Sequence, residues 1–290
     1  MHKEVFYTKK DIKDCRIAIF SDLHYYPSYP PKILNKIIKQ IKESKVNYIA
    51  ILGDILDSSN CTELSKLKDF LTTISSIAPT MVILGNHEKK AGYRHNWHNE
   101  ENEELINILK STKNLYFLND SNYQDNNINF YGFNLSYEYY NQGEPYELFI
   151  EEVENLKTNL EDKNYNITLI HSPINIYKYL EEHQEYNLNK TNLILSGHMH
   201  NGCLPFWFSN IINKVFHTSR SIISPSGKLF PKYSQGRIYS RDGYIYQGIS
   251  KLSKSQKFFH FFERFYSKQI SIIEIKKTSW MMWTPIWRHQ

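Results

Sequence analysis

Residues 16–24 read Arg16-Ile17-Ala18-Ile19-Phe20-Ser21-Asp22-Leu23-His24. The first five form a compact apolar run, which is typical of a short buried β-strand. An aspartate and a histidine follow where this strand is expected to end. The arrangement recurs twice, because the run 47–52 precedes Gly53-Asp54 and the run 80–84 precedes Gly85-Asn86-His87-Glu88. Three predicted strands therefore each lead into polar side chains that could bind a metal.

Helical patterns separate these runs. Apolar residues recur at helical spacing from Ile33 to Ile41 and again from Leu64 to Ile74. Alternation of short buried-type strands with helices predicts parallel βαβ units. Crossovers in such units are right-handed and place the carboxyl ends of the strands at one edge of the sheet.

The second half of the chain is less regular. It shows further helical and β-type patterns, and beyond about residue 215 Gly-containing turns separate short β-like pieces. The patterns are a helix around 105–109, a strand at 128–133, a helix at 148–160, and strands at 167–170 and 193–195. We expect a mixed, layered α/β (α+β) domain over residues 1–250, in which sheets pack together between helices. Residues 251–290 are expected to form a C-terminal extension with an amphipathic helix, a strand and an aromatic tail, packed on the same domain.

Composition sets bounds on function. The 290 residues carry 35 Lys and Arg against 30 Asp and Glu, a net charge of +5. This mild excess permits an anionic substrate, but without a dense basic run or a recognised motif we expect no specific nucleic-acid binding. The three cysteines, the lack of a signal-peptide pattern and the lack of a 20-residue apolar stretch predict a cytoplasmic protein.

Potential metal ligands follow five of the predicted strands. Open α/β sheets bind ligands at the carboxyl ends of their strands, so side chains far apart in sequence are expected to converge. The steps from Asp22 to Asp54 and from Asp54 to Asn86 are each 32 residues, about one βαβ repeat. The candidate metal ligands are Asp22, His24, Asp54, Asn86, His171, His198 and His200.

The residue types indicate which metals would fit. Two carboxylates, one amide oxygen and four imidazoles form a mixed oxygen and nitrogen set, which suits Mn, Fe or Zn better than Ca or Mg. Seven ligands are too many for one tetrahedral ion. They suit two divalent metal ions that share a bridging carboxylate, about 3.5–4 Å apart. Glycines before three of the ligands would permit tight turns and close backbone approach.

This ordered set of motifs, which spans residues 21–200, resembles the calcineurin-like metallophosphoesterase superfamily. The resemblance implies a four-layer α/β/β/α sandwich of two mixed sheets flanked by helices. It also implies that Asp22, His24 and His200 hold the first metal, that Asp54 bridges, and that Asn86, His171 and His198 hold the second.

His87 follows Asn86 and is not needed as a ligand. We therefore expect it to be the catalytic residue that protonates the leaving group. The alternative is that His87 contacts the substrate, or that it contacts a metal ligand without binding the metal itself.

A segment after the last motif resembles one branch of the superfamily in particular. Residues 227–233 and the Gly-containing stretch at 236–248 are similar to the bacterial phosphodiesterase branch of the superfamily, some members of which act at membranes on lipid-linked or pyrophosphate substrates. The chain departs from that branch at Met199 and at 201–203, where a threonine and Gly-Gly-Gln are frequent. The departures leave the metal ligands intact and concern substrate preference.

We therefore expect a hydrolase that cleaves a phosphodiester or pyrophosphate bond of a lipid-linked or nucleotide substrate with metal-activated water. Phosphomonoesterase activity and a non-catalytic metal-binding scaffold are the alternatives. Phenylalanines at 258–265 and tryptophans at 280–287 suggest peripheral contact with the inner face of the cell membrane, or else packing on the core.

Overall fold

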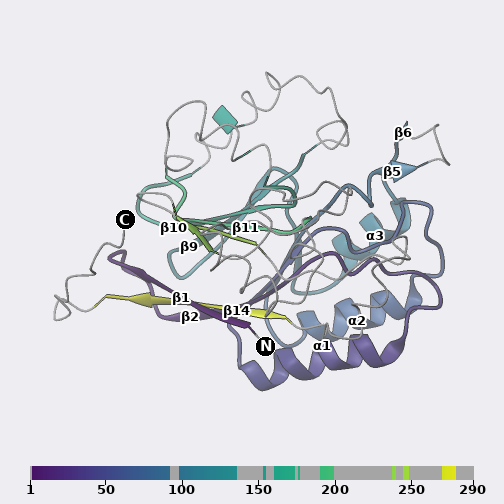
Figure 1. Cartoon of the computed structure of the whole chain (residues 1–290), viewed down its shortest axis with the longest axis horizontal. Helices are drawn as coiled ribbons and strands as arrows, with labels where there is room; N and C mark the ends of the chain where they lie inside the picture. Colours follow the sequence, from purple (N-terminus) through teal and green to yellow (C-terminus); the bar gives the residue numbers. More distant parts are fainter. Residues whose placement is uncertain are drawn as a thin grey trace, which may run out of the picture.

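Two stacked sheets occupy the centre of the protein in a computed structural model (Figure 1). The structure describes residues 2–91, 98–135, 153–154, 160–173, 176, 190–198, 237–239, 244–247 and 270–278. The first sheet has the strand order β1 (His2–Thr8), β14 (Ser271–Lys277), β2 (Cys15–Phe20), β3 (Tyr48–Leu52), β4 (Thr80–Ile83) and β7 (Leu115–Phe117). The second has the order β12 (Arg237–Tyr239), β13 (Tyr244–Gln247), β11 (Leu193–Ser196), β10 (Tyr165–Ile170), β9 (Ile128–Phe133) and β8 (Ser121–Asp125).

Both sheets are mixed. Strands β2, β3, β4 and β7 are parallel, whereas β14 runs antiparallel to β2. In the second sheet β9, β10, β11 and β13 are parallel, and β8 and β12 are antiparallel edge strands. A small antiparallel pair, β5 (Lys90–Ala91) and β6 (His98–Asn99), stands apart from them. The predicted parallel units and the class of two mixed sheets flanked by helices are confirmed.

Three helices lie wholly within the described ranges, α1 (Pro31–Ser44), α2 (Ser65–Ser75) and α3 (Glu103–Ser111). Helix α1 starts with proline, whose fixed φ suits the first helical position, and it ends at Lys45 in the left-handed conformation. Helix α3 is capped by Asn102, whose side chain accepts the Leu105 N–H at 2.8 Å. All three agree with the predicted helical patterns.

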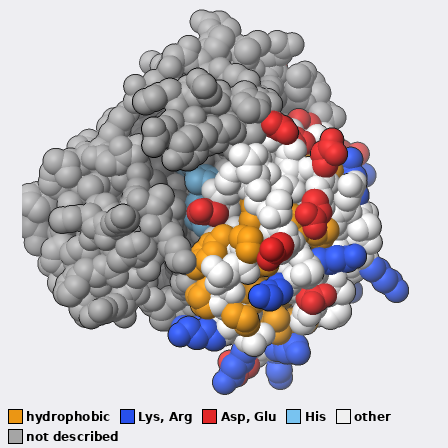
Figure 2. Space-filling model, turned by 90° about the vertical axis from the view of Figure 1, so that its right-hand side faces the viewer, with side chains coloured by type: hydrophobic (Ala, Val, Ile, Leu, Met, Phe, Trp, Pro, Cys, Tyr) orange, Lys and Arg blue, Asp and Glu red, His pale blue; other side chains and the backbone are white. Residues whose placement is uncertain are grey.

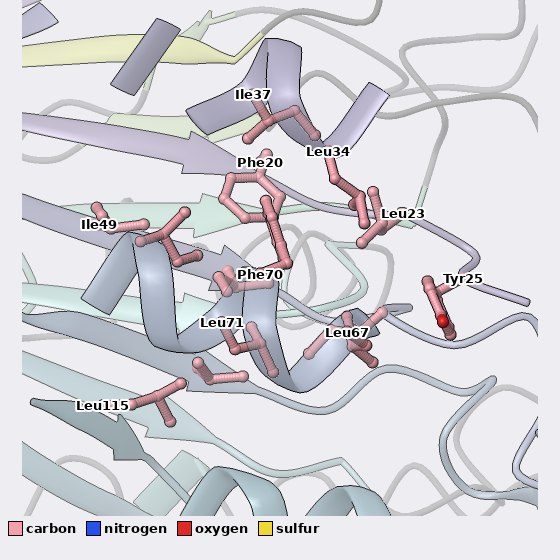
Figure 3. Packing of buried hydrophobic residues seen from close by; sticks show 14 of the residues in the cluster. Phe20, Leu23, Tyr25, Leu34, Ile37, Ile49, Leu67, Phe70, Leu71 and Leu115 are labelled. Atoms are coloured by element: carbon pink, nitrogen blue, oxygen red, sulfur yellow. The ribbon is translucent and has the colours of Figure 1, made fainter. Parts of the chain in front are cut away.

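The alternation of side chains along the strands divides the core in two. In β2, Ala18 and Phe20 face the helices, whereas Ile17 and Ile19 face the second sheet. Figure 3 shows Phe20 among residues of α1 and α2, and its ring lies 6.1 Å from that of Phe70 in an edge-to-face arrangement. Burial of each such side chain contributes about 1.5–3 kcal/mol. This packing holds the ends of the central strands in place.

The last described strand, β14, lies in the sheet between β1 and β2, the first two strands of the chain. Neither its position nor strand β1 was predicted. The division of domains at residue 250 stays a prediction, and the expected amphipathic helix and aromatic tail lie outside the described residues. The predicted 148–160 helix also lies mostly outside them, although Val153 and Glu154 are helical. Within the described ranges, none of the helices has the length and apolar character that crossing a bilayer requires.

Candidate metal centre

The site forms where the strands of both sheets end. Parallel strands β2, β3 and β4 lead into the loops that carry Asp22, Asp54 and Asn86, and β10 leads into His171. The loops after β2 and β3 are joined through their backbones, because Asp22 and His24 donate their N–H groups to the carbonyls of Gly53 and Asp54, both at 3.0 Å. Convergence at the strand ends therefore occurs as predicted for the ligands that the structure describes.

Several of these residues have unusual backbone geometry. The φ angles are 53° at Asp22, 47° at His24, 51° at Asp54 and 67° at His198. Non-glycine residues rarely adopt this left-handed region, and such residues gather at functional sites. The tightly packed loops hold the four side chains in directions that a relaxed strand end would not give.

Two glycines make this packing possible. Gly53 has a φ of 85°, and a Cβ there would lie 2.6 Å from the Gly85 nitrogen and from His171 Nδ1. A Cβ on Gly85 would lie 2.5 Å from the Asp54 nitrogen and 2.8 Å from His171 Cε1. The loops after β3 and β4 can approach each other and His171 only because both positions lack a side chain.

Asp54 lies at the middle of the site and is fully buried. Its Oδ1 is 3.2 Å from His171 Nε2 and accepts the His87 N–H at 2.9 Å. Its Oδ2 is 3.8 Å from His24 Nε2. The two oxygens of one carboxylate thus face histidines that follow strands of different sheets.

The ring of His171 is oriented by the backbone. Its Nδ1–H donates to the Leu52 carbonyl at 2.6 Å, so Nε2 points into the site. Three potential ligand atoms surround that nitrogen: Asp54 Oδ1 and Asn86 Oδ1 at 3.2 Å, and His198 Nδ1 at 3.3 Å. Two oxygen acceptors beside an imidazole nitrogen require a proton or a cation between them. The donor set therefore fits a divalent metal.

Asp22 connects the first sheet to the loop after β11. Its carboxylate accepts a hydrogen bond from the Ser21 hydroxyl, and its Oδ1 accepts the His198 N–H at 3.2 Å. A Cβ on Gly197 would lie 2.7 Å from Ser21 Oγ, so this contact also depends on glycine. These bonds place His198 beside the buried carboxylates.

Charge is concentrated in this buried space. Burial raises the pKa of Asp22 to about 7, and the neighbouring Asp54 carboxylate adds to the increase. Burial on its own would lower the pKa of His171, but the Asp54 carboxylate raises it to about 9. Burial opposes the ionisation of Asp54 as well, yet the surrounding histidines hold its pKa well below the usual range. The carboxylates thus require positive charge, which imidazolium or bound cations can supply.

His87 lies at the accessible side of the site. Its Nδ1–H donates to the Asp57 carbonyl at 2.6 Å, which turns Nε2 toward Asp54 Oδ2 at 3.9 Å. Its side chain is 27% exposed, and the Asp57 side chain is 40% exposed. Figure 2 shows histidine side chains beside an acidic side chain on one face of the protein. His87 is therefore close to the candidate ligands and within reach of a substrate.

The structure contains three groups of side chains whose potential ligand atoms lie within 4.8 Å of one another, among the residues it describes. They are Asp22 with His24 and Asp54; Asp54 with His171 and His198; and His24 with Asp57 and His87. His200 lies outside the described residues. The remaining six predicted ligands are brought together, since Asn86 contacts His171.

Sequence reasoning missed Asp57 and Glu88 at this site, and also Lys89, which follows Glu88 in the chain. The fully buried Glu88 accepts backbone hydrogen bonds from two loops, and the buried Lys89 donates to Asn134 and to the Leu135 carbonyl beyond β9. The only available signal was the position of Glu88 in the Gly-Asn-His-Glu motif. Charged residues are usually exposed to solvent, so the amino-acid sequence alone does not reveal that Glu88 and Lys89 are buried.

Comparison with known proteins agrees with this geometry. The family model described as Calcineurin-like phosphoesterase matches residues 15–202, which include every candidate ligand. The chain belongs to the calcineurin-like phosphoesterase family.

Its curated relatives are uncharacterized metallophosphoesterases. One from Campylobacter jejuni is 26% identical over 201 residues, covering 68% of this chain and 47% of that protein. One from Helicobacter pylori is 25% identical, covering 71% and 50%, and one from Aquifex aeolicus is 27% identical, covering 77% of each. The chain spans about half the length of the Campylobacter and Helicobacter relatives.

Solved structures also match the chain. A dimetal phosphatase from Danio rerio is 11% identical with a TM-score of 0.43, covering 81% of this chain and 87% of that one. GAP50, the anchor in the inner membrane complex of Plasmodium, is 12% identical with a TM-score of 0.38, covering 83% and 76%.

Proposed function

We propose that this metallophosphoesterase uses two divalent metal ions to hydrolyse a phosphodiester or pyrophosphate bond. The observation that carries the proposal is the position of Asp54, which belongs to two of the candidate ligand groups. Its Oδ2 faces His24, whereas its Oδ1 faces His171. A carboxylate that offers one oxygen to each of two ligand sets is the arrangement that a two-metal site needs.

The described residues divide naturally between two ions. Asp22, His24 and Asp54 would hold one, and Asp54, Asn86, His171 and His198 the other, with His200 as a further ligand of the first. The mixed donor set favours Mn, Fe or Zn. When bound, the two ions would lower the pKa of a coordinated water and neutralise the phosphoryl oxygens.

His87 is the proposed proton donor to the leaving group. Because its Nδ1–H is occupied by the Asp57 carbonyl, only Nε2 is directed toward the site. An imidazolium in this position can release the Nε2 proton to a departing oxygen while the Nδ1 bond keeps the ring in place. Its partial exposure fits contact with a substrate that enters from solvent.

The proposed substrate is a phosphorylated small molecule or a lipid-linked phosphate or pyrophosphate. Support comes from residues 227–248, which resemble the bacterial phosphodiesterase branch. Most of this segment lies outside the described residues. We also propose that the protein works in the cytoplasm and touches the inner face of the membrane through the aromatic C-terminal region. The retained ligand set and His87 weigh against a non-catalytic scaffold.

A metal-reconstituted hydrolysis panel tests the reaction. The full chain is stripped of metal, reloaded with Mn, Fe or Zn, and supplied with an aryl monoester, an aryl diester, nucleotide sugars and lipid pyrophosphates. We expect the diester or pyrophosphate substrates to be cleaved fastest, and Asp54→Asn to remove most of this activity because the ligand shared by both ions is lost. A preference for the monoester would favour phosphomonoesterase activity, and no turnover with any metal would refute the proposal.

A further inference from the structure

We propose that Glu88 is a positioning residue for the metal centre, whose carboxylate fixes the loops that present Asp54 and Asn86. The inference rests on the proposed two-metal function. It assigns a role to a buried charged side chain that is not itself among the proposed ligands.

The carboxylate of Glu88 binds backbone groups from two loops at once. Its Oε2 accepts the N–H of Asp54 at 2.9 Å and that of Gly85 at 2.6 Å. Its Oε1 accepts the N–H of Leu56 at 2.7 Å. One side chain therefore links the loop after β3, which carries the bridging carboxylate, to the loop after β4, which carries Asn86.

The link is reciprocal. Glu88 accepts the backbone N–H of Asp54, and the Asp54 carboxylate accepts the backbone N–H of His87 at 2.9 Å. Each loop thus contributes a carboxylate that binds the backbone of the other. This double connection sets both the position of Asp54 and the direction of its Oδ1, the oxygen that faces His171.

A carboxylate suits this role better than a neutral group. Three N–H donors converge on two oxygens, and an amide in place of the carboxylate would turn an NH₂ group toward at least one of them. Glu88 is fully buried, and so is the Asp54 carboxylate whose negative charge acts on it. Gathering this much negative charge away from water is costly unless cations lie nearby. The cost is understandable if the loops are ordered to hold a pair of divalent ions.

Mn²⁺ binding to the full chain tests the inference. The metal-free protein is titrated with Mn²⁺, and electron paramagnetic resonance reports both free Mn²⁺ and any spin-coupled pair. The variants are Glu88→Gln, which can keep the bonds from Asp54 and Gly85, and Glu88→Ala, which loses all three. The matched control is Glu274→Gln, because Glu274 is a buried carboxylate in β14 that pairs with Lys3 and Arg16, outside the candidate ligand groups.

We expect Mn²⁺ affinity to fall about tenfold in Glu88→Gln and about a hundredfold in Glu88→Ala, with loss of the spin-coupled signal. Glu274→Gln should lower the melting temperature of the metal-free chain and leave Mn²⁺ affinity unchanged. If Glu88→Ala does not fold, the glutamine variant still decides the question.

Three results would overturn the inference. If Glu88→Gln binds the Mn²⁺ pair as tightly as the unsubstituted chain, the role of Glu88 is refuted and the proposed function stands. An equal loss of affinity in Glu274→Gln would also refute that role, because the effect would then reflect general destabilisation. An unsubstituted chain that binds no Mn²⁺ pair would refute the proposed function together with it.

Discussion

Oδ1 of Asp54 and Nε2 of His171 lie 3.2 Å apart, although one residue follows β3 of the first sheet and the other follows β10 of the second. The contact joins the two sheets at the edge where their parallel strands end. The Leu52 carbonyl orients His171, and the His87 N–H binds Asp54 Oδ1, so neither partner can turn away without breaking another bond. The proposed metal centre therefore depends on how the two sheets are docked.

Replacing His87 by asparagine should separate catalysis from metal binding. We expect turnover to fall by about 10²–10⁴-fold, since the proposed proton donor is lost, while bound metal stays near the original level. The loss should be smaller for an aryl diester, whose leaving group needs little protonation, than for an alkyl diester. Metal analysis and steady-state rates on both substrates measure this. Parallel loss of metal and activity would assign His87 to metal binding instead.

Gly53→Ala should destabilise the metal-free protein by at least about 1–2 kcal/mol, the cost of a left-handed conformation for a residue with a side chain. Its Cβ would also clash with Gly85 and His171 at 2.6 Å. Lys45→Gly is the opposite control, because Lys45 is exposed, has a φ of 48° and ends helix α1. Urea denaturation should show a gain of about 1 kcal/mol for this variant, because glycine adopts the left-handed conformation without that cost. Unchanged stability in Gly53→Ala would contradict the close approach of the loops.

Stability at low pH should depend on Glu274. Burial opposes its ionisation, but hydrogen bonds from Lys3 and Arg16 outweigh this and lower the pKa of Glu274 below its usual value of 4.5. The stabilisation is therefore fully present above pH 4.5 and disappears as pH falls through the lowered pKa. At pH 7 we expect Glu274→Gln to be less stable by about 1 kcal/mol, since both cationic partners are half exposed. Urea midpoints of the two proteins should converge in acid, and a constant gap would show that ionisation is irrelevant.

Removal of metal should lower thermal stability. Ions that bind only the folded chain stabilise it by about 2.7 kcal/mol when their concentration is a hundred times the dissociation constant. A chelator should therefore lower the melting temperature, and added Mn²⁺ should restore it. Asp54→Asn provides the comparison, because its melting temperature should respond much less to either treatment. An identical response in both proteins would argue against Asp54 as a shared ligand.

Much of the fold could be predicted from local patterns. The helical spacing of Leu67, Phe70, Leu71 and Ile74 indicated α2, because these side chains form one buried face. The continuous apolar run at β3 indicated a parallel strand buried on both sides. The position of β14 could not be predicted, since it pairs with β1 and β2 across more than 250 residues and leaves no local trace.

The sequence by itself determined which residue types stand at the strand ends, and hence the candidate ligands, because strand periodicity and motif order are local properties. Only the tertiary structure decided how those ligands are oriented. The left-handed backbone at Asp54, the carbonyl that turns His87 and the burial of Glu88 all arise from contacts between loops of different strands. Such contacts exist only after the sheets have packed, because no short segment contains both partners.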